Sequence, residues 1–161
     1  PMSVYTNTSL PEEIKEGNIK NYIKMGENEV GALTFGWHDL EKIGDRYARF
    51  IIGYYANAYL KNDSLEEKER RLRLEIFSYI PNRVSVFVND NRVGMFECLP
   101  NQLQEVEFKF KDNAKFLKIT VCPERIFKPS VEFGSNDDRT LGVAVSKIEI
   151  VDNKQPLIRT H

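Results

Sequence analysis

The stretch RLRLEIFSYIPNRVSVFVNDNRVGMF, residues 71–96, decides the fold. Aliphatic residues occupy every second position of residues 71–77, with Arg or Glu between them, and this period of two predicts a half-buried strand. Valine repeats at the same period in residues 83–89. The Asn-Asp-Asn sequence at 89–91 is typical of a tight turn. The stretch therefore predicts a strand followed by a β-hairpin whose second strand is residues 92–96.

Similar patterns extend in both directions from this stretch. The further strands predicted from alternation or from β-branched and aromatic content are residues 18–25, 49–60, 105–110, 116–121 and 141–151. Within residues 49–60, one face is small and apolar: Ala56, Ala58 and Leu60. The other face is polar and carries two phenol rings: Tyr55, Asn57 and Tyr59.

A polar, turn-rich segment, FKPSVEFGSNDDRTLG at residues 127–142, leads into the last of these strands. Pro129, Gly134 and the Ser-Asn-Asp-Asp run that follows favour turns, so we expect a shaped loop. In the strand itself the inward positions change from odd to even numbers at Ser146. A β-bulge produces such a shift of phase.

Seven or eight short strands separated by turns, with no substantial helix, predict an all-β protein. We expect an antiparallel β-sandwich of the jelly-roll or immunoglobulin-like kind. Residues 1–17 are expected to be an N-terminal arm or linker, residues 18–151 the sandwich domain, and residues 152–161 a flexible tail. A chain of 161 residues is long enough to bury the core of one such domain.

The overall composition excludes several classes of function. With a net charge of −1 and a pI near 6.2, the chain has no general attraction for nucleic acid or anionic membranes. No apolar run approaches the roughly 20 residues that span a bilayer, so we expect a soluble protein without direct membrane insertion. Cys98 and Cys122 lie on or beside predicted strands. They are interpreted as small buried thiols, with a disulfide between them as the alternative.

The sequence does not predict a catalytic residue, a metal site or a cofactor. A glycosidase needs two carboxylates about 5 to 9.5 Å apart, and the adjacent Asp137 and Asp138 do not form such a pair by themselves; Glu41 could supply a partner. His38 is the sole candidate base, because the other histidine is the last residue of the chain. The spacing of the cysteines and histidines also lacks a zinc signature.

Calcium binding is an alternative role for the loop at residues 127–142, because four side chains there offer oxygen ligands close together. These residues are Glu132, Asn136, Asp137 and Asp138. Side chains of this kind also cap the backbone of their own turn. We favour the capping interpretation for this loop.

Aromatic residues gather in one quarter of the chain, and their flat rings with polar tips suit the apolar face of a sugar. The predicted carbohydrate-binding residues are Trp37, His38, Tyr55, Asn57 and Tyr59. The alternative for Trp37 is a place in the sandwich core. The tyrosines on the polar face of residues 49–60 are therefore the stronger candidates.

Three segments together resemble a known family. They are MGENEVGALTFGWHDLE at residues 25–41, Arg49 ahead of the aromatic strand, and FKPSVEFGSNDDRTLGVAVSKIEI at residues 127–150. This pattern resembles the β-sandwich accessory domains of bacterial surface-polysaccharide glycosyltransferases and methyltransferases. A related sandwich is the carbohydrate-binding domain of the O-antigen ABC exporters. The positions that match are Gly36, Trp37, Glu41, Arg49, Pro129, Asp138, Arg139, Leu141 and Gly142.

The resemblance implies a non-catalytic domain that recognises a polysaccharide or oligosaccharide and holds it near an appended enzyme or transporter subunit. It also implies a cytoplasmic location, at the inner face of the membrane through that host protein. A homodimer is a further possible partner, and a structural or dimerisation domain without its own sugar site is the alternative function. The chain departs from the family pattern at His38, where a tyrosine is usual, and at Phe50, where a tryptophan is usual.

Four of the matching or neighbouring charged residues suggest a separate structural role. We expect an ion-pair network of Glu41, Arg49, Asp138 and Arg139 that ties the glycine-bearing loops together over one end of the sandwich. Such a network would build the fold first, and any ligand site would lie beside it.

Overall fold

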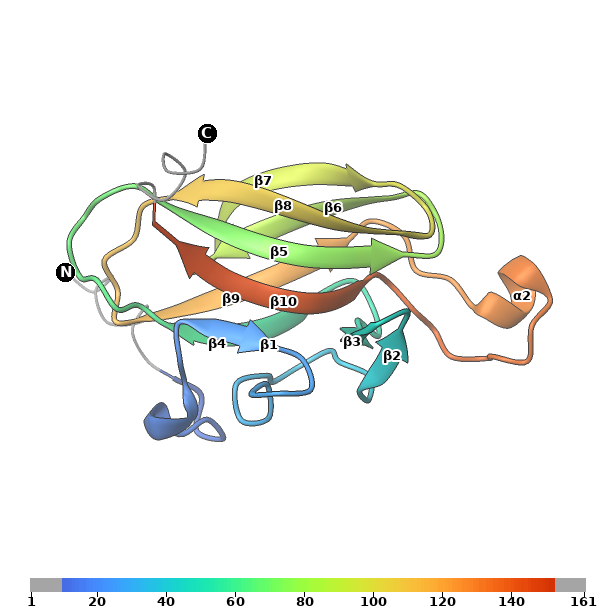
Figure 1. The fold of residues 1–161 in the computed structure, drawn as a ribbon, viewed down its shortest axis with the longest axis horizontal. Coiled ribbons are helices and arrows are strands. Elements are labelled where there is room, and N and C mark those ends of the chain that lie inside the picture. Colours follow the sequence, from blue (N-terminus) through green and yellow to red (C-terminus); the bar gives the residue numbers. More distant parts are fainter. Residues whose placement is uncertain (1–9, 153–161) are drawn as a thin grey trace.

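Two antiparallel sheets pack face to face in the computed structural model, which describes residues 10–152 (Figure 1). The six-stranded sheet contains β1 (Tyr22–Lys24), β2 (Glu41–Ile43), β3 (Arg46–Phe50), β5 (Arg70–Ser78), β8 (Gln102–Phe110) and β10 (Ala144–Val151). The four-stranded sheet contains β4 (Ala56–Lys61), β6 (Asn82–Val88), β7 (Asn91–Cys98) and β9 (Phe116–Pro123). The remaining elements are a 3₁₀ turn, η1 (Glu16–Asn18), and one short helix, α2 (Pro129–Phe133).

The strand order is that of a jelly roll. The order β3-β10-β5-β8 in one sheet faces the order β4-β9-β6-β7 in the other. The chain therefore passes repeatedly from one sheet to the other, and only β6 and β7 among these eight strands form a hairpin within one sheet. The prediction of an antiparallel all-β sandwich is confirmed.

The hairpin predicted from the Asn89-Asp90-Asn91 sequence forms as expected. Val88 pairs with Asn91, which leaves a two-residue turn. Asn89 and Asp90 both have positive φ, at 48° and 70°. A turn of this type matches the twist of the flanking strands and favours Asn and Asp at its centre.

Residues 49–60 do not form one strand, so this prediction is wrong in its boundaries. The chain leaves the six-stranded sheet after Phe50 and enters the four-stranded sheet at Ala56. The sequence stays apolar across this crossing, and Ile51, which lies between the two strands, is completely buried. Gly53 is the one residue within 51–55 that is typical of a break in a strand.

The phase shift predicted at Ser146 is confirmed. The pairing of β10 with β5 is irregular between Val145 and Lys147. On its other edge, β10 pairs with β3 up to Val145 and with β1 from Lys147 onward. The bulge therefore lies where the strand changes neighbours, and it explains why the inward positions change parity.

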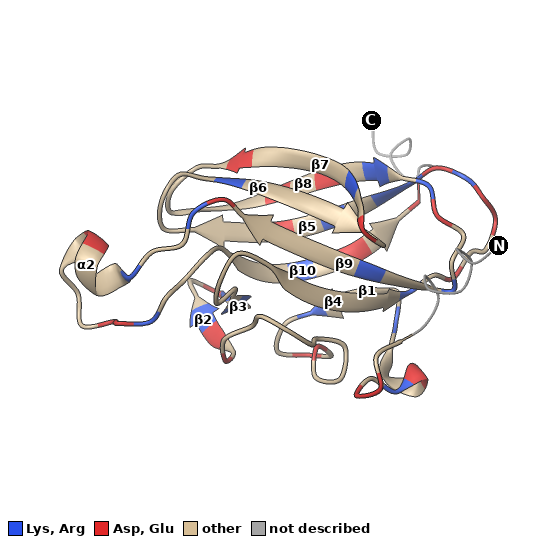
Figure 2. Cartoon of the chain, turned by 180° about the vertical axis from the view of Figure 1, so that it is seen from behind, with Lys and Arg blue, Asp and Glu red and all other residues tan. Residues whose placement is uncertain are grey.

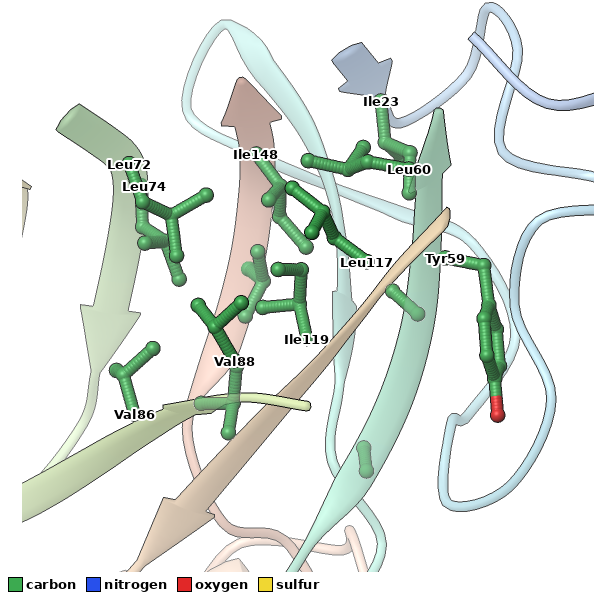
Figure 3. Packing of buried hydrophobic residues seen from close by; sticks show 14 of the residues in the cluster. Ile23, Tyr59, Leu60, Leu72, Leu74, Val86, Val88, Leu117, Ile119 and Ile148 are labelled. Atoms are coloured by element: carbon green, nitrogen blue, oxygen red, sulfur yellow. The ribbon is translucent and has the colours of Figure 1, made fainter. Parts of the chain in front are cut away.

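Aliphatic side chains from both sheets fill the space between them (Figure 3). The alternation in residues 71–77 is confirmed, since Leu72, Leu74 and Ile76 have no exposed surface. They meet Leu117 and Ile119 of β9 from the facing sheet in one cluster. This packing removes apolar area from water at about 25 cal/mol per Å² and is the main stabilising contribution.

Part of the segment expected to be an N-terminal arm or linker lies against this core. Ile14 is buried, and Leu10 packs beside it. Ile19, just after η1, is buried as well. The remainder of the expected arm, residues 1–9, and all but Asp152 of the expected flexible tail lie outside the described residues.

The outward face of the six-stranded sheet is charged. Arg73 of β5 contacts Glu107 of β8 at 2.6 Å and Glu149 of β10 at 3.4 Å, while Arg71 contacts Glu107 at 3.1 Å. These pairs connect three adjacent strands across their solvent side.

No helix among residues 10–152 is long and apolar enough to cross a membrane.

The two cysteines are free, so the disulfide alternative is wrong. Cys98 of β7 belongs to the core cluster, and burial raises the pKa of its thiol to about 12. Cys122 of β9 faces outward beside Thr120. The side chains of these cysteines therefore point to opposite faces of the same sheet.

A second, aromatic cluster closes the end of the sandwich that carries α2 (Figure 1). Tyr79 stacks on Phe50 at 5.5 Å between ring centroids and meets Phe77 edge-on at 5.0 Å. The shaped loop expected at residues 127–142 is present, with α2 inside it as an element that the sequence did not predict. Gly134, with φ of 73°, caps this helix.

Replacement of Leu74 by alanine is expected to lower the free energy of unfolding by about 2 to 5 kcal/mol, because it leaves a cavity between the sheets. Leu65→Ala is the matched control, since Leu65 is 60% exposed in the β4–β5 connection; it should change stability by less than about 0.5 kcal/mol. Urea denaturation followed by circular dichroism measures both. Equal losses would contradict the assignment of the core.

Candidate functional site

Exposed aromatic rings gather over the outward face of the four-stranded sheet. Phe35 and Tyr55 stack with their ring centroids 4.8 Å apart, and they are 56% and 45% exposed. Tyr54 beside them is 60% exposed. A hollow of about 300 Å³, which we call the aromatic pocket, is lined by Tyr54, Tyr55, Phe87, Asp90, Thr120 and Cys122. This volume is at the lower end of the range for small-molecule sites.

The register of the sheet brings the lining residues together. Asn57 of β4 pairs with Thr120 of β9, which pairs on its other side with Phe87 of β6. Since directly paired residues share a face, their side chains form a row across three strands. Cys122 is two positions further along β9 and so lies on the same face. In Figure 2, β4, β6 and β9 are mostly tan, in contrast to the banded β5 and β8.

Two polar side chains that line the aromatic pocket, Thr120 and Asp90, already have partners. Thr120 Oγ1 donates a hydrogen bond to Asn57 Oδ1 at 2.8 Å. Lys118 Nζ lies 2.9 Å from Asp90 Oδ1. The hydroxyl groups of the exposed Tyr54 and Tyr55 form no hydrogen bond with residues 10–152 and face the rim of the pocket. The site thus combines ring faces with a few polar groups at its edge.

A close approach of two backbone segments positions Phe35. The amide of Asn57 donates to Phe35 O at 3.0 Å, and the amide of Thr34 donates to Asn57 O at 3.2 Å, so residues 32–37 extend the sheet beyond the edge of β4. Gly36 has φ of 101°, and a Cβ there would lie 2.8 Å from Ala56 Cα and collide with the carbonyl oxygen of Tyr55. Only glycine fits this position without displacement.

Of the five residues predicted to bind carbohydrate, Tyr55 lines the aromatic pocket and Asn57 supports it through Thr120. The indole of Trp37 is turned elsewhere: its Nε1 donates to Asn57 O at 2.8 Å, and it lines a separate hollow of about 240 Å³ beside Arg49. His38 Nε2 lies 2.8 Å from Thr140 O at the end of the sandwich.

The expectation that Tyr59 is exposed is wrong. It lies on the outward face of β4 and points away from Leu60 (Figure 3), but only 8% of its surface is accessible. Its amide donates to Ala32 O at 2.9 Å, so the segment that extends the sheet flanks this position. Burial is the main cause of the raised pKa of Tyr59.

Three aromatic residues of this surface are not among the five predicted carbohydrate-binding residues: Phe35, Tyr54 and Phe87. The position of Phe87 could have been read from the sequence, because Val86 and Val88 on either side of it point inward. Phe35 and Tyr54 gave no such signal, since neither lies in a regular strand. Tyr54 directly precedes Tyr55 in the chain, and only the fold brings Phe35 against Tyr55.

The predicted ion-pair network forms in part. Arg139 bridges Glu41 at 3.2 Å and Asp137 at 2.8 Å. Arg49 does not join them, because it pairs with the buried Glu29 at 3.1 Å. Asp138 is exposed and forms no ion pair with described residues, so Asp137 occupies the place that was expected for it.

The contacts of Arg139 also account for an acidic residue of the loop at residues 127–142. Hydrogen bonds from the Arg139 side chain lower the pKa of Asp137 to about 2, and the Arg139 amide adds a further hydrogen bond to the same carboxylate. Asp137 and Glu41 are thus both held by one guanidinium, whose own pKa is raised. Residues 10–152 contain no group of three or more His, Cys, Asp or Glu side chains that could hold a metal ion.

No protein-family model matches the chain. No curated protein matches it either. The similar solved structures include carbohydrate-binding modules and, over part of its length, an exo-beta-1,3-galactanase.

Three of these structures illustrate the likeness. A family 35 carbohydrate-binding module from Clostridium thermocellum has a TM-score of 0.55 at 12% identity, over 81% of this chain and 98% of the module. CsCBM6-3 from Clostridium stercorarium, in complex with cellobiose, has a TM-score of 0.50 at 9% identity, over 83% of this chain and 94% of that one. The exo-beta-1,3-galactanase of Phanerochaete chrysosporium, with beta-1,3-galactotriose, has a TM-score of 0.52 at 14% identity over 82% of this chain.

The alignment covers only 29% of the galactanase, so this chain spans less than a third of that enzyme. The modules are matched over nearly their whole length. At 9–14% identity the likeness establishes the fold alone.

Gly36→Ala is expected to destabilise the protein by more than about 1 kcal/mol, because the new Cβ meets backbone atoms and the positive φ becomes strained. Gly17→Ala is the control: it has no atom within 4 Å of its added Cβ and no positive φ. Thermal unfolding by calorimetry compares the two. A Gly36→Ala protein as stable as the control would show that the approach of residues 32–37 to β4 is not tight.

Asp137→Asn is expected to remove a pH-dependent contribution to stability. The folded-state pKa of Asp137 is about 2, below its ordinary value of 3.8. Because this pKa is depressed, the ion pair stabilises the protein above about pH 4, and that stability is lost as the pH falls toward 2. The variant should lose about 1 kcal/mol or less at pH 7 and match the parent near pH 2.

The neighbouring Asp138→Asn is the control for this measurement, because Asp138 is exposed and unpaired with any described residue. Urea unfolding at several pH values between 2 and 7 gives the two curves. Identical pH dependence of Asp137→Asn and the parent protein would contradict the assigned ion pair.

Proposed function

We propose that this chain is a non-catalytic carbohydrate-binding domain that recognises a bacterial surface polysaccharide, such as an O-antigen-like glycan. It acts for an associated glycan-modifying enzyme or transporter. The observation that carries the proposal is the exposed aromatic pocket on the four-stranded sheet. Two solved structures with a similar fold hold oligosaccharides, cellobiose in one and beta-1,3-galactotriose in the other.

The chemistry of the aromatic pocket supports this proposal. Sugars present apolar C–H faces that pack on aromatic rings, while their hydroxyl groups need hydrogen-bond partners at the edge. Tyr54 and Tyr55 supply exposed rings that line the hollow, and the exposed Phe35 ring stacks on Tyr55 beside it. Phe87 contributes a further ring from β6. Such large exposed apolar groups are expected at binding surfaces rather than on inert ones.

The roles of the charged residues support a non-catalytic function. The candidate acids Glu41 and Asp137 share Arg139 as their partner, and the low pKa of Asp137 keeps it ionised at neutral pH. A glycosidase requires one protonated carboxyl group as the acid. Neither residue lines the aromatic pocket.

The biological setting of the proposal comes from the sequence resemblance to accessory domains of surface-polysaccharide assembly. The residues that carry it, among them Gly36 and Arg139, hold the loops around the sandwich in place. In this setting the domain is cytoplasmic and bound to its host enzyme or transporter. It retains the glycan close to the site where the host acts on it.

Tyr55→Ala is expected to weaken glycan binding at least tenfold, because it removes one ring of the stacked pair. An array of bacterial surface-polysaccharide fragments identifies a ligand, and titration calorimetry then measures its affinity, which we expect near millimolar, or about −4 kcal/mol. Tyr47→Ala is the control, since Tyr47 is 48% exposed on β3 of the other sheet. It should leave binding unchanged.

Two results would count against the proposal. If no fragment binds to the parent protein at millimolar concentration, the sugar-binding function fails. If the protein instead forms a concentration-dependent dimer that shields Tyr54 and Tyr55, sedimentation and tyrosine fluorescence would favour the structural or dimerisation function.

A further inference from the structure

The aromatic pocket differs chemically between its rim and its floor. Tyr54 is 60% exposed and Tyr55 is 45% exposed, and the Asp90 side chain is 77% exposed. These residues form the rim. Phe87, Thr120 and Cys122 are only partly exposed and form the floor. Polar groups that can bind sugar hydroxyls are therefore concentrated at the rim.

The floor offers few hydrogen-bonding groups. The Phe87 ring has no polar atom. Thr120 Oγ1 uses its one proton in the hydrogen bond to Asn57 Oδ1, at 2.8 Å, and can otherwise only accept. Cys122 carries a thiol, which is a weak donor and acceptor, and burial raises its pKa, so it is uncharged at neutral pH. A ligand group that reaches this floor loses its contacts with water and gains few polar contacts.

We infer that the aromatic pocket selects a sugar that carries a methyl group, with the methyl on the floor and the ring hydroxyls at the rim. A 6-deoxyhexose provides this group at C6, and a methyl ether provides the same chemistry elsewhere on the ring. The inference rests on the proposed function and names the class of sugar that the same site takes.

The physical reason is a difference between two substituents of similar size. Burial of a methyl group improves binding by roughly fourfold through the hydrophobic effect. A hydroxymethyl group at the same place must give up hydrogen bonds to water, and an unpaired hydroxyl usually costs tenfold or more in affinity. Together these effects favour the 6-deoxy sugar over its parent by about tenfold or more.

The test compares sugars that differ only at the group in question. L-rhamnose is compared with L-mannose, and D-fucose with D-galactose, because each pair differs only in the hydroxyl at C6. A third pair, 3-O-methyl-D-glucose and D-glucose, tests the methyl ether. Chemical-shift titration of the intact chain gives the dissociation constants. Saturation-transfer NMR shows which ligand protons lie closest to the protein.

We expect the 6-deoxy sugar to bind about tenfold more tightly in at least one of the first two pairs, with its methyl protons receiving the strongest saturation. If the preference appears in the third pair alone, the methyl chemistry holds and its source is an ether. If each parent sugar binds as tightly as its methyl-bearing partner, the inference is overturned.

Cys122→Ser tests the floor directly, because it places a stronger hydrogen-bonding hydroxyl where the thiol was. The affinity ratio within each pair should fall several-fold toward one. Ser85→Ala is the control: Ser85 pairs with Cys122 across the two strands but does not line the aromatic pocket. The ratio should stay unchanged in this control, and thermal unfolding confirms that both variants fold. An unchanged ratio in Cys122→Ser would also count against the inference.

The results separate the two proposals. Binding that is lost in Tyr55→Ala but shows no preference for a methyl group leaves the proposed function intact and refutes only the inference. Absence of binding by every sugar and by every polysaccharide fragment refutes the proposed function, and the inference with it.

Discussion

The packing of two sheets through their aliphatic faces is the constraint on which the rest of this structure depends. Because side chains alternate along a strand, each residue buried between the sheets obliges its neighbours to face outward. Leu72 and Leu74 of β5 are buried, and Arg71 and Arg73 beside them reach the solvent side. The core therefore decides which residues are available for binding.

The outward faces of the two sheets differ in their content of charged side chains. On the six-stranded sheet, Arg73 and its carboxylate partners connect neighbouring strands. Exposed pairs of this kind add little stability individually, and they make the central strands of this face strongly charged. On the four-stranded sheet, the exposed Tyr54 and Tyr55 lie around an uncharged floor formed by Phe87, Thr120 and Cys122. The proposed sugar-binding function uses the second, less charged face.

The loops at one end of the sandwich are fixed by a separate set of contacts. Arg139 joins Glu41 to Asp137 and also lies over the Phe50 ring, at 5.9 Å from its centroid. This cation–π and ion-pair arrangement connects the loop that contains α2 to β2 and β3. Loss of function in a variant at Arg139 would therefore reflect the loop structure first, and it would not identify a ligand contact.

Alternation and turn chemistry were sufficient to predict the all-β sandwich, the β6–β7 hairpin and the bulge at Ser146. These features depend on residues close together in the chain, and local periodicity records them. The crossing at residues 51–55 was missed because Ile51 is as apolar as a strand residue, although it lies between the two sheets.

The sequence by itself determined the aliphatic side chains that β5 and β6 place between the sheets, because these side chains follow the period of two. Tertiary structure decided which outward residues meet. In the folded protein Phe35 stacks on Tyr55 and Tyr59 is buried. Arg49 forms its ion pair with Glu29 and not with Glu41 or Asp137, which pair with Arg139. These outcomes depend on how the segment at residues 32–37 runs along the edge of β4, and no short-range pattern encodes that path.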